Sequence, residues 1–287
     1  MRSASLRVSK RSWSTRLPSW NSSPVTTRRL RLPVGTVNLV VDIVELFDLA
    51  VDLAQRASQL LLDEAPDRAE DVATKSSRTD MVTAVDRASE ALIVGTIEKE
   101  RPDDGVLGEE GSKRDGTSGV RWIIDPLDGT TNYLYGFPVY AVSIGVEVNG
   151  EVEAGVVVHP TLQEVFTARR GEGAQCNGAT IAVSDKADLS TALIGTGFAY
   201  DSASVRDVRR AGAAAVDLCW VACGRLDGYY EAGLSPWDVA AGELIAREAG
   251  AQTSDFEGGP VRADHVIAAT PGIGPPLRHL VSEAVKL

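Results

Sequence analysis

Apolar residues between positions 43 and 61 recur at three- and four-residue spacing, which is the pattern of an amphipathic helix. The pattern ends near Asp63 to Pro66, where acidic residues and a proline interrupt it. We expect this helix to be scaffolding that packs on the core. Its apolar positions are Ile43, Leu46, Phe47, Ala50, Leu53, Ala54, Ala57, Leu60 and Leu61.

A second helix is predicted to follow, with Asp80 or Thr83 as its N-cap. Asp86 would lie in its first turn. A carboxylate at that position can be explained simply by its favourable interaction with the helix dipole. The apolar residues assigned to this helix are Val85, Leu92, Ile93 and Ile97.

The middle of the chain predicts strands. Residues 106–107 and 122–124 are short apolar runs, and three longer runs follow them at 139–148, 152–159 and 164–168. The longer runs are separated by turn signals such as Asn149-Gly150, and another hairpin turn is predicted at Asn177-Gly178. We interpret the longer runs as an antiparallel meander.

The last hundred or so residues alternate between strand and helix patterns, which is typical of α/β organisation. Ser235 and Pro236 open one of these helices, and Gly250 closes it. We therefore divide the chain into an N-terminal α+β half, 37–184, and a C-terminal α/β half, 185–287. Within the second half the predicted strands are 192–196, 226–231 and a run from 266, and the predicted helices are 209–225, 235–250 and 277–285.

Residues 1–36 differ from the remainder, because they carry eight basic residues and no acidic residue. They lack the apolar run of a secretory signal. The segment is either a flexible basic tail or a non-native extension from a misjudged start codon, with Val34, Val37 or Val40 as the true start. We favour the extension, because nothing in the segment is typical of a packing element.

The charge and the cysteine content narrow the function classes. A formal net charge of −11 and a pI near 4.8 argue against direct nucleic-acid binding. No apolar run is long enough for a membrane span. The sparse cysteines fit a reduced, cytoplasmic setting, and for Cys219 and Cys223 we favour buried packing over metal or redox use. The histidines His159, His265 and His279 form no zinc pattern, so we assign them no catalytic role.

The candidate chemistry lies where the run ending at Ile124 meets Asp125-Pro126-Leu127-Asp128-Gly129-Thr130. We expect Pro126 to stop ladder pairing, Gly129 to turn the backbone, and Thr130 to Asn132 to cap a short helix. Carboxylates beside free backbone amides suit a magnesium ion that bridges them to a phosphate. The simpler alternative is a strand-to-helix turn that uses Asp, Pro and Gly as turn formers.

Two further acidic positions extend this hypothesis. Glu109 and Glu110 follow the strand 106–107 in a glycine-flanked turn, so two neighbouring strand ends could converge on one cation. Asp238 lies at the start of the helix 235–250. Each also has a plain interpretation, since acids are common in exposed turns and at helix N-termini.

Three segments together resemble the inositol monophosphatase family: Gly108-Glu109-Glu110, residues 122–132 and Trp237-Asp238 through Gly242. The similarity extends from about Val41 to the C-terminus and includes 75–77, 82–86 and 229–231. The family belongs to the magnesium-dependent, lithium-sensitive phosphatases. The resemblance implies an α/β fold of the α+β type, layered as an αβαβα sandwich like that of fructose bisphosphatase, and a homodimer.

The same resemblance implies roles for individual residues. Two or three Mg²⁺ ions would be held by the carboxylates and one carbonyl, with a weaker position near Asp86. Glu109 and Thr130 would orient and deprotonate the attacking water. The phosphate would be held by the amides of Gly129 and Thr130. The metal ligands would be Glu109, Asp125, the carbonyl of Leu127, Asp128 and Asp238, with Asp125 also counted as catalytic; the substrate residues would be Asp128, Gly129, Thr130, Gly212, Ala213, Ala214 and Glu231.

Two departures from the family pattern affect the substrate side. Residues 212–215 read Gly-Ala-Ala-Ala and lack the hydroxyl that the family usually has there. The link from Tyr200 to Arg209 is shorter than in relatives, through loss of a helix or absence of residues.

The sequence therefore predicts a phosphomonoesterase that acts on inositol 1-phosphate or a similar polyol phosphate. Histidinol phosphate, fructose 1,6-bisphosphate and 3'-phosphoadenosine 5'-phosphate are alternative substrates. The nucleotide is less favoured, because the chain has no obvious basic or stacking residues that would recognise it. A different class of function is binding to the transcription machinery. A third is a structural calcium site, which the open arrangement of the acids disfavours.

Overall fold

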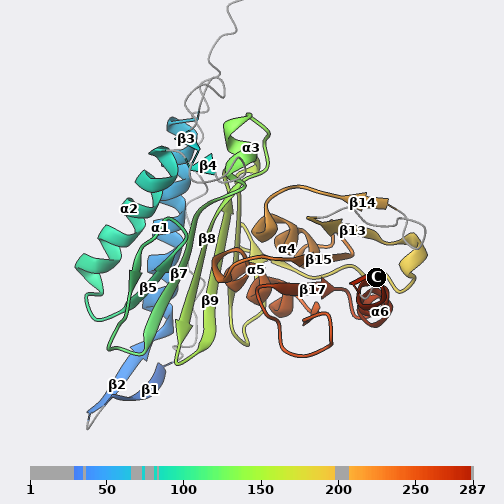
Figure 1. The fold of residues 1–287 in the computed structure, drawn as a ribbon. Helices are drawn as coiled ribbons and strands as arrows, with labels where there is room; N and C mark the ends of the chain where they lie inside the picture. Colours follow the sequence, from blue (N-terminus) through green and yellow to red (C-terminus); the bar gives the residue numbers. More distant parts are fainter. Residues whose placement is uncertain are drawn as a thin grey trace, which may run out of the picture.

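The structure is a computed structural model that describes residues 29–34, 37–65, 73–74, 81–82, 84–197 and 207–285. It has five layers (Figure 1). Helices α1 (Ile43–Asp63) and α2 (Ala84–Glu100) cover one face of an eight-stranded sheet. Helices α4 (Ala214–Ala222) and α5 (Pro236–Glu248) lie between this sheet and a five-stranded one, whose other face is covered by α6 (Gly274–Val285). The predicted αβαβα sandwich is confirmed.

The first sheet contains the predicted meander. Its strand order is β12-β11-β10-β9-β8-β7-β5-β6, and every neighbouring pair is antiparallel except β5 with β7. Asn149 and Asn177 have positive φ at the predicted hairpin turns, as such turns require. The strands are β5 (Gly105–Gly108), β6 (Lys113–Arg114), β7 (Val120–Asp128), β8 (Ala141–Val148), β9 (Glu151–His159), β10 (Glu164–Arg169), β11 (Ala174–Cys176) and β12 (Ala179–Ile181).

The second sheet has the order β14-β13-β15-β17-β16. The break between the two sheets falls between Ile181 and Leu193, next to the boundary that we predicted at 184 and 185. Helix α5 belongs to the second half of the chain but packs on β8, β9 and β10 of the first sheet. The division into halves stays a prediction. The strands are β13 (Leu193–Thr196), β14 (Asp207–Arg209), β15 (Gly228–Ala232), β16 (Gln252–Ser254) and β17 (His265–Ala269).

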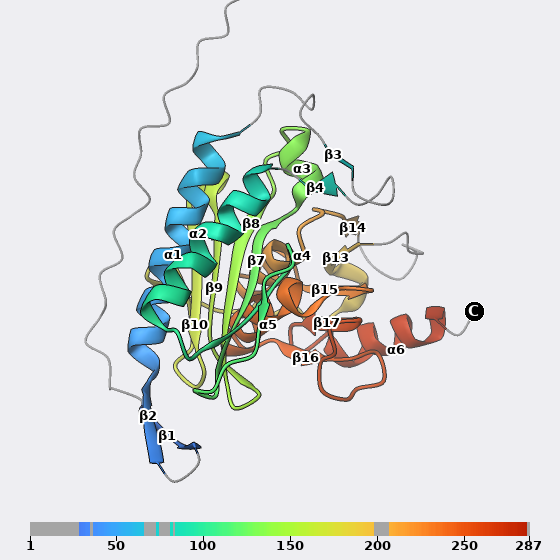
Figure 2. The same ribbon diagram turned by 60° about the vertical axis from the view of Figure 1, so that its left-hand side comes forward.

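Strand alternation separates the core into three layers, because successive side chains point to opposite faces. In β9, Val156 and Val158 pack with α1, whereas Val157 packs in the layer that contains α4 and α5. In β17, Val266 and Ala268 face that middle layer, and Ile267 faces α6. Figure 2 shows α1 and α2 lying side by side over the first sheet. Cys219 is fully buried in the middle layer, as predicted, whereas Cys223 packs against this layer but is only partly buried.

The N-terminal segment differs in part from the prediction. Residues 29–34 form β1 (Arg29–Val34), which pairs antiparallel with β2 (Val37–Asp42). The signal for this strand was present, since Arg29, Leu30, Arg31 and Leu32 alternate polar and apolar. The rest of the predicted extension, residues 1–28 together with 35 and 36, lies outside the described residues.

Several smaller features complete the chain. The strands β3 (Ala73–Thr74) and β4 (Met81–Val82) pair with each other. The segment 75–77, the predicted caps Asp80 and Thr83, and most of the short link before Arg209 lie outside the described residues. In the part of the chain that the structure describes, no helix combines the length and the apolar character that a membrane crossing requires.

Close backbone contact seats α5 on the first sheet. A Cβ added to Gly155 of β9 would lie 2.9 Å from the carbonyl oxygen of Ala241, inside normal contact distance. We expect Gly155→Ala to lower the free energy of unfolding by about 1–3 kcal/mol, as overpacking does. The control is Gly95→Ala in α2, where nothing lies within 4 Å of the new methyl and helix propensity predicts a gain of about 0.5–1 kcal/mol.

Urea unfolding of both variants measures these changes. Equal stability of the Gly155 variant and the wild type would show that α5 can move away from the sheet at no cost.

Candidate active site

The parallel pair β5 and β7 brings two strand ends to one edge of the first sheet. Gly108 pairs with Ile124, and the N–H of Glu109 donates to the carbonyl of Ile124 at 3.2 Å. Glu109 therefore emerges beside Asp125. The predicted convergence of these two strand ends is confirmed.

The prediction that Pro126 ends the ladder is wrong. Asp125 pairs with Ser143, and pairing resumes at Asp128 with Ala141 after a register shift. The proline interrupts the ladder for a short distance without ending the strand. Residues three apart on a regular strand would point to opposite faces. Because of the shift, Asp125 and Asp128 can both reach the same cluster, which is how bulges re-aim side chains near active sites.

Three carboxylates meet here. Oxygens of Asp125, Asp128 and Asp238 all lie within 4.8 Å of one another. Asp125 and Asp128 are buried, and Asp238 is partly exposed. The cluster combines two residues of β7 with one from α5, so it joins the two halves of the chain.

The carboxylate of Asp128 serves as the N-terminal cap of α4. It accepts the N–H groups of Ala214 at 3.2 Å and Ala215 at 2.7 Å. Ala213 occupies the N-cap position and makes no side-chain bond of its own. A carboxylate from a strand far away in sequence thus caps α4, where Ala213 has no polar side chain that could do so.

Asp238 lies at the start of α5, as predicted. Its carboxylate accepts the N–H of Ser235 at 2.6 Å, and Pro236 occupies the first turn. The hydroxyl of Ser143 on β8 donates to the carbonyl of Trp237 at 3.3 Å. These bonds fix the start of α5 against the first sheet and aim Asp238 at the cluster.

Thr130 connects the cluster to α2. Its hydroxyl lies 3.1 Å from the carbonyl of Leu127 and 3.3 Å from Oδ2 of Asp86, so one proton is shared between two acceptors. Burial, together with the charges of Glu109 and Glu110, raises the pKa of Asp86 to about 8. Asp86 therefore lies beside Thr130 at the margin of the cluster.

The helix after the cluster begins differently from the prediction. The N-cap of α3 (Thr130–Leu134) is Gly129, whose φ of 89° is in the left-handed region, and no side chain caps the helix. Asn132 instead donates to the carbonyls of Val139 at 2.7 Å and Ala211 at 2.8 Å. Asn132 thereby holds the turn that contains Gly212 against α3.

The remaining predicted substrate residue, Glu231, lies near the C-terminal end of β15, the central strand of the second sheet. Its carboxylate accepts the hydroxyl of buried Tyr229. A Cβ on Gly197 would fall 1.7 Å from Oε1 of Glu231, so a larger residue at position 197 would have to displace this carboxylate. Burial raises the pKa of Glu231, and the charge of Asp238 adds to this effect, which places Glu231 within electrostatic reach of the cluster.

The cluster fits a divalent cation. Oδ2 of Asp125 is buried and has no hydrogen-bond partner among the described residues. Burial raises the pKa of Asp125 and of Asp128 well above the usual range, and the neighbouring carboxylates add to it. The pKa of Glu109 rises to about 7 for the same reasons. Buried, mutually repelling carboxylates stay ionised together only beside compensating positive charge, and hard oxygen donors suit magnesium.

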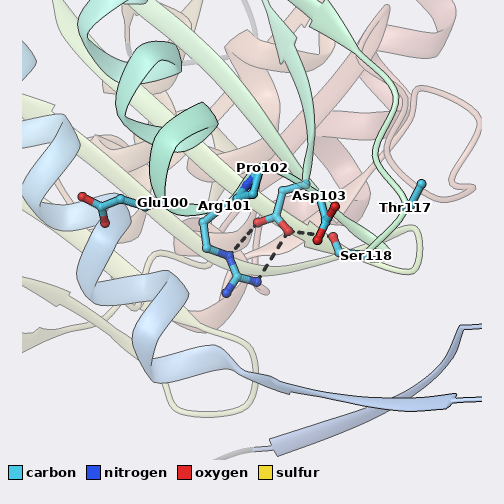
Figure 3. Close-up of a pocket in the computed structure, with 7 residues that line it drawn as sticks. Glu100, Arg101, Pro102, Asp103, Thr117 and Ser118 are labelled. Atoms are coloured by element: carbon cyan, nitrogen blue, oxygen red, sulfur yellow. Dashed lines mark hydrogen bonds and ion pairs between the residues drawn. The ribbon is translucent and has the colours of Figure 1, made fainter.

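A hollow of about 370 Å³ lies at the other end of α2, away from the carboxylate cluster (Figure 3). Its central carboxylate, Asp104, is fully used: it accepts from Arg101 Nε at 3.0 Å, Ser118 Oγ at 2.6 Å and Trp122 Nε1 at 3.0 Å. The hydrogen bonds of Asp104 therefore form a buried structural network. The hollow is lined by Glu100, Arg101, Pro102, Asp103, Asp104, Thr117 and Ser118.

Sequence reasoning missed two polar residues of α2. Ser89 and Glu90 are buried on the same helix face as Asp86. A signal existed, because Asp86, Ser89, Glu90, Ile93 and Ile97 follow helical spacing and so lie on one buried stripe. Polar residues that continue an apolar stripe have to find partners inside the protein.

Comparison with known proteins identifies the family. A profile of the inositol monophosphatase family matches residues 42–285. The chain belongs to the inositol monophosphatase family. The matched residues include Asp125, Asp128 and Asp238, so the similarity to the family extends over both halves of the chain that contribute to the site.

Individual relatives agree with this membership. The Nus factor SuhB of Vibrio cholerae is 41% identical over 254 residues, which cover 82% of this chain and 95% of the relative. The extragenic suppressor protein SuhB of Bartonella henselae has a TM-score of 0.79 at 36% identity, covering 83% of this chain and 99% of that one. An IMPase from Thermotoga maritima has a TM-score of 0.79 at 34% identity, with 84% and 98% covered. The inositol monophosphatase fold therefore extends over almost the whole of these relatives.

Proposed function

We propose that this chain is a magnesium-dependent phosphomonoesterase that hydrolyses inositol 1-phosphate to inositol and phosphate. The observation that carries the proposal is the carboxylate group of Asp125, Asp128 and Asp238, of which the first two are buried and Asp128 directly precedes Gly129 and Thr130 on the chain. Such a group supports the binding of hard cations, and membership of the inositol monophosphatase family supports a phosphatase reaction.

The proposed cation ligands are the carboxylates of the cluster together with Glu109 and the carbonyl of Leu127. Asp86 is proposed at a weaker position, and two or three magnesium ions would bind. When bound, they would neutralise the phosphate, lower the pKa of the attacking water and stabilise the departing alkoxide. Oδ2 of Asp125, which is buried and has no hydrogen-bond partner in the described part of the chain, supports this assignment.

The chain's own groups would position the reactants. Because the hydroxyl of Thr130 donates toward Asp86 and Leu127, its lone pairs remain available to accept a hydrogen bond from a water molecule. Glu109, at the end of β5, would accept the proton of that water. The backbone amides of Gly129 and Thr130 would hold the phosphate oxygens. Holding the reactants in line in this way converts a slow bimolecular attack into a local one.

The alcohol part of the substrate would meet Asp128, Ala214 and Glu231, with Gly212 and Ala213 beside them. A carboxylate accepts hydrogen bonds from hydroxyl groups, so Glu231 suits a polyol. The same negative charge disfavours a second phosphate, because like charges repel in a partly buried site. Fructose 1,6-bisphosphate and 3'-phosphoadenosine 5'-phosphate are therefore weaker alternatives than histidinol phosphate, whose ammonium group Glu231 would attract.

The substrate assignment predicts an order of preference. We expect phosphate release in saturating magnesium to have its highest kcat/KM with inositol 1-phosphate among these four substrates. The two substrates with a second phosphate should be slower by about tenfold or more, corresponding to roughly 1.4 kcal/mol of repulsion. Steady-state phosphate release measures this order. A preference for either doubly phosphorylated compound would contradict the assignment. A preference for histidinol phosphate would mean that the substrate is the phosphate ester of an amino alcohol and not of inositol.

A second candidate function is binding to the transcription machinery. It is favoured by the name of the relative from Vibrio cholerae, a Nus factor. Capture of purified RNA polymerase by this chain in the absence of magnesium, with no phosphate release from any of the four substrates, would support it as the main function. Phosphate release without capture of RNA polymerase would contradict the binding function and support the phosphatase function alone.

Three further properties complete the proposal. We propose a homodimer and inhibition by lithium, which the family resemblance implies, and a cytoplasmic location, which the sparse cysteines favour. Sedimentation of the purified chain and phosphate release in the presence of lithium chloride test the first two.

A further inference from the structure

Helix α2 buries three polar side chains at its site end. The exposed fractions of Asp86, Ser89 and Glu90 are 1%, 0% and 3%. Buried polar groups destabilise a protein unless they are hydrogen-bonded, so each should have a defined partner. The partners of Ser89 and Glu90 are backbone groups of the two segments that carry the proposed cation ligands.

Glu90 holds the turn that carries Glu109. Its carboxylate accepts the N–H of Glu110 at 2.8 Å through Oε2 and the N–H of Ser112 at 3.0 Å through Oε1. A Cβ on Gly108 would lie 2.5 Å from Oε2, so the turn wraps the carboxylate closely. The N–H of Gly108 also donates to the carbonyl of Ser112 at 2.7 Å, which closes the turn.

Ser89 holds the segment that carries Asp125. Its hydroxyl donates to the carbonyl of Pro126 at 3.0 Å. This carbonyl lies where the ladder between β7 and β8 is interrupted. The side chain of Ser89 therefore supplies a buried hydrogen bond at the interruption, where β7 forms no regular pair with β8.

Ser89 and Glu90, which are adjacent on α2, thus form hydrogen bonds to both segments that carry proposed metal ligands. We propose that Ser89 and Glu90 are positioning residues, which set the separation between Glu109 and Asp125 and thereby the affinity of the site for magnesium. The inference rests on the proposed function. Neither residue is proposed to touch the substrate.

The expected effect is on cation affinity. Loss of a partner that orients metal ligands typically costs 10-fold to 100-fold in metal affinity. Glu90→Gln keeps the shape, but its amide group cannot accept the second N–H, so one bond to the turn is lost. Ser89→Ala removes the only side-chain bond to Pro126 that the described residues contain. We expect the magnesium dissociation constant to rise about 10-fold in either variant, with the KM for inositol 1-phosphate in saturating magnesium unchanged.

The control is Ser118→Ala, which removes a buried hydroxyl that bonds Asp104 at 2.6 Å at the opposite end of α2. It should lower thermal stability without altering magnesium binding. Calorimetric titration of each purified protein with magnesium is the readout, and circular dichroism confirms that the variant titrated is folded. If Glu90→Gln does not fold, Ser89→Ala decides the test.

The outcomes separate the two proposals. Weaker magnesium binding by the α2 variants, with normal binding by Ser118→Ala, supports positioning. Wild-type affinity in the folded α2 variants, or an equal loss in the control, overturns it. A wild-type protein that binds no magnesium would instead overturn the proposed function, and the positioning role with it.

Discussion

Asp125→Asn is expected to lower kcat for phosphate release from inositol 1-phosphate by about a thousandfold. Preorganised charge stabilisation of this kind contributes several kcal/mol to a reaction barrier. Asp125 is buried at the centre of the cluster, and the burial leaves one of its oxygens without a partner among the described residues. An amide has the same shape but no charge, so the variant should lose cation binding and keep the fold.

The stability of the same variant should change in a characteristic way. Without metal, the wild type holds several carboxylates close together, so replacing one by an amide relieves repulsion. We therefore expect the metal-free variant to melt no lower than the metal-free wild type. Magnesium should raise the Tm of the wild type but not that of the variant, because a ligand stabilises only the state that binds it.

The matched control is Asp103→Asn, the same chemical change on an exposed residue at the far end of α2. It should leave kcat and the magnesium-dependent Tm unchanged. Wild-type kcat in Asp125→Asn would show that the carboxylate is not part of the machinery.

Gly129→Ala is expected to lower both stability and activity. Gly129 has a φ of 89°, which favours glycine, and a Cβ there would lie 2.9 Å from the carbonyl oxygen of Val139 and 3.2 Å from Cβ of Ala213. Backbone strain and overpacking together should cost about 2–4 kcal/mol. Because the amides of Gly129 and Thr130 are proposed to hold the phosphate, a shift of about 1 Å should lower kcat/KM by about a hundredfold.

Gly150→Ala separates these two effects. Gly150 also has a positive φ, of 86°, but nothing lies within 4 Å of an added Cβ. The control should therefore lose about 1–2 kcal/mol from backbone strain alone and keep full activity. Urea unfolding and phosphate release on both variants test the pair. Full activity in Gly129→Ala would mean that this turn does not hold the substrate.

The local elements were predictable because their signals are local. The stripe from Ile43 to Leu61 predicts a helix, and α1 covers it. Asn149 and Asn177 mark turns by their own conformational preference, and both turns occur. The acidic segments could be located for the same reason, since Glu109 and Asp125 each follow a short apolar run and Asp238 follows the helix-start signal of Ser235 and Pro236.

The tertiary arrangement of the site was less predictable. That Asp128 caps α4 could not be read from either segment, because the two are far apart in sequence and Ala213 offers no cap of its own. The resumption of the ladder at Asp128 depends on strand β8, not on Pro126. Helical spacing signals that Glu90 is buried, but it does not reveal the bonds that its carboxylate makes to the turn at 108–112.

These contacts explain why the site sits at the boundary between the two sheets. Strand β7 supplies Asp125 and Asp128, α5 supplies Asp238, and Asp128 also fixes the start of α4. The relative positions of these three carboxylates therefore depend on the packing of α4 and α5 between the two sheets. Mutations in the middle layer, such as Gly155→Ala, should disturb the site through α5.

The most direct test of the central claim is a magnesium titration of phosphate release from inositol 1-phosphate, starting from chelator-treated wild-type protein. We expect no release without magnesium and a saturable rise as magnesium is added. The same release at every magnesium concentration, or none at any, would contradict a magnesium-dependent phosphomonoesterase built on Asp125, Asp128 and Asp238.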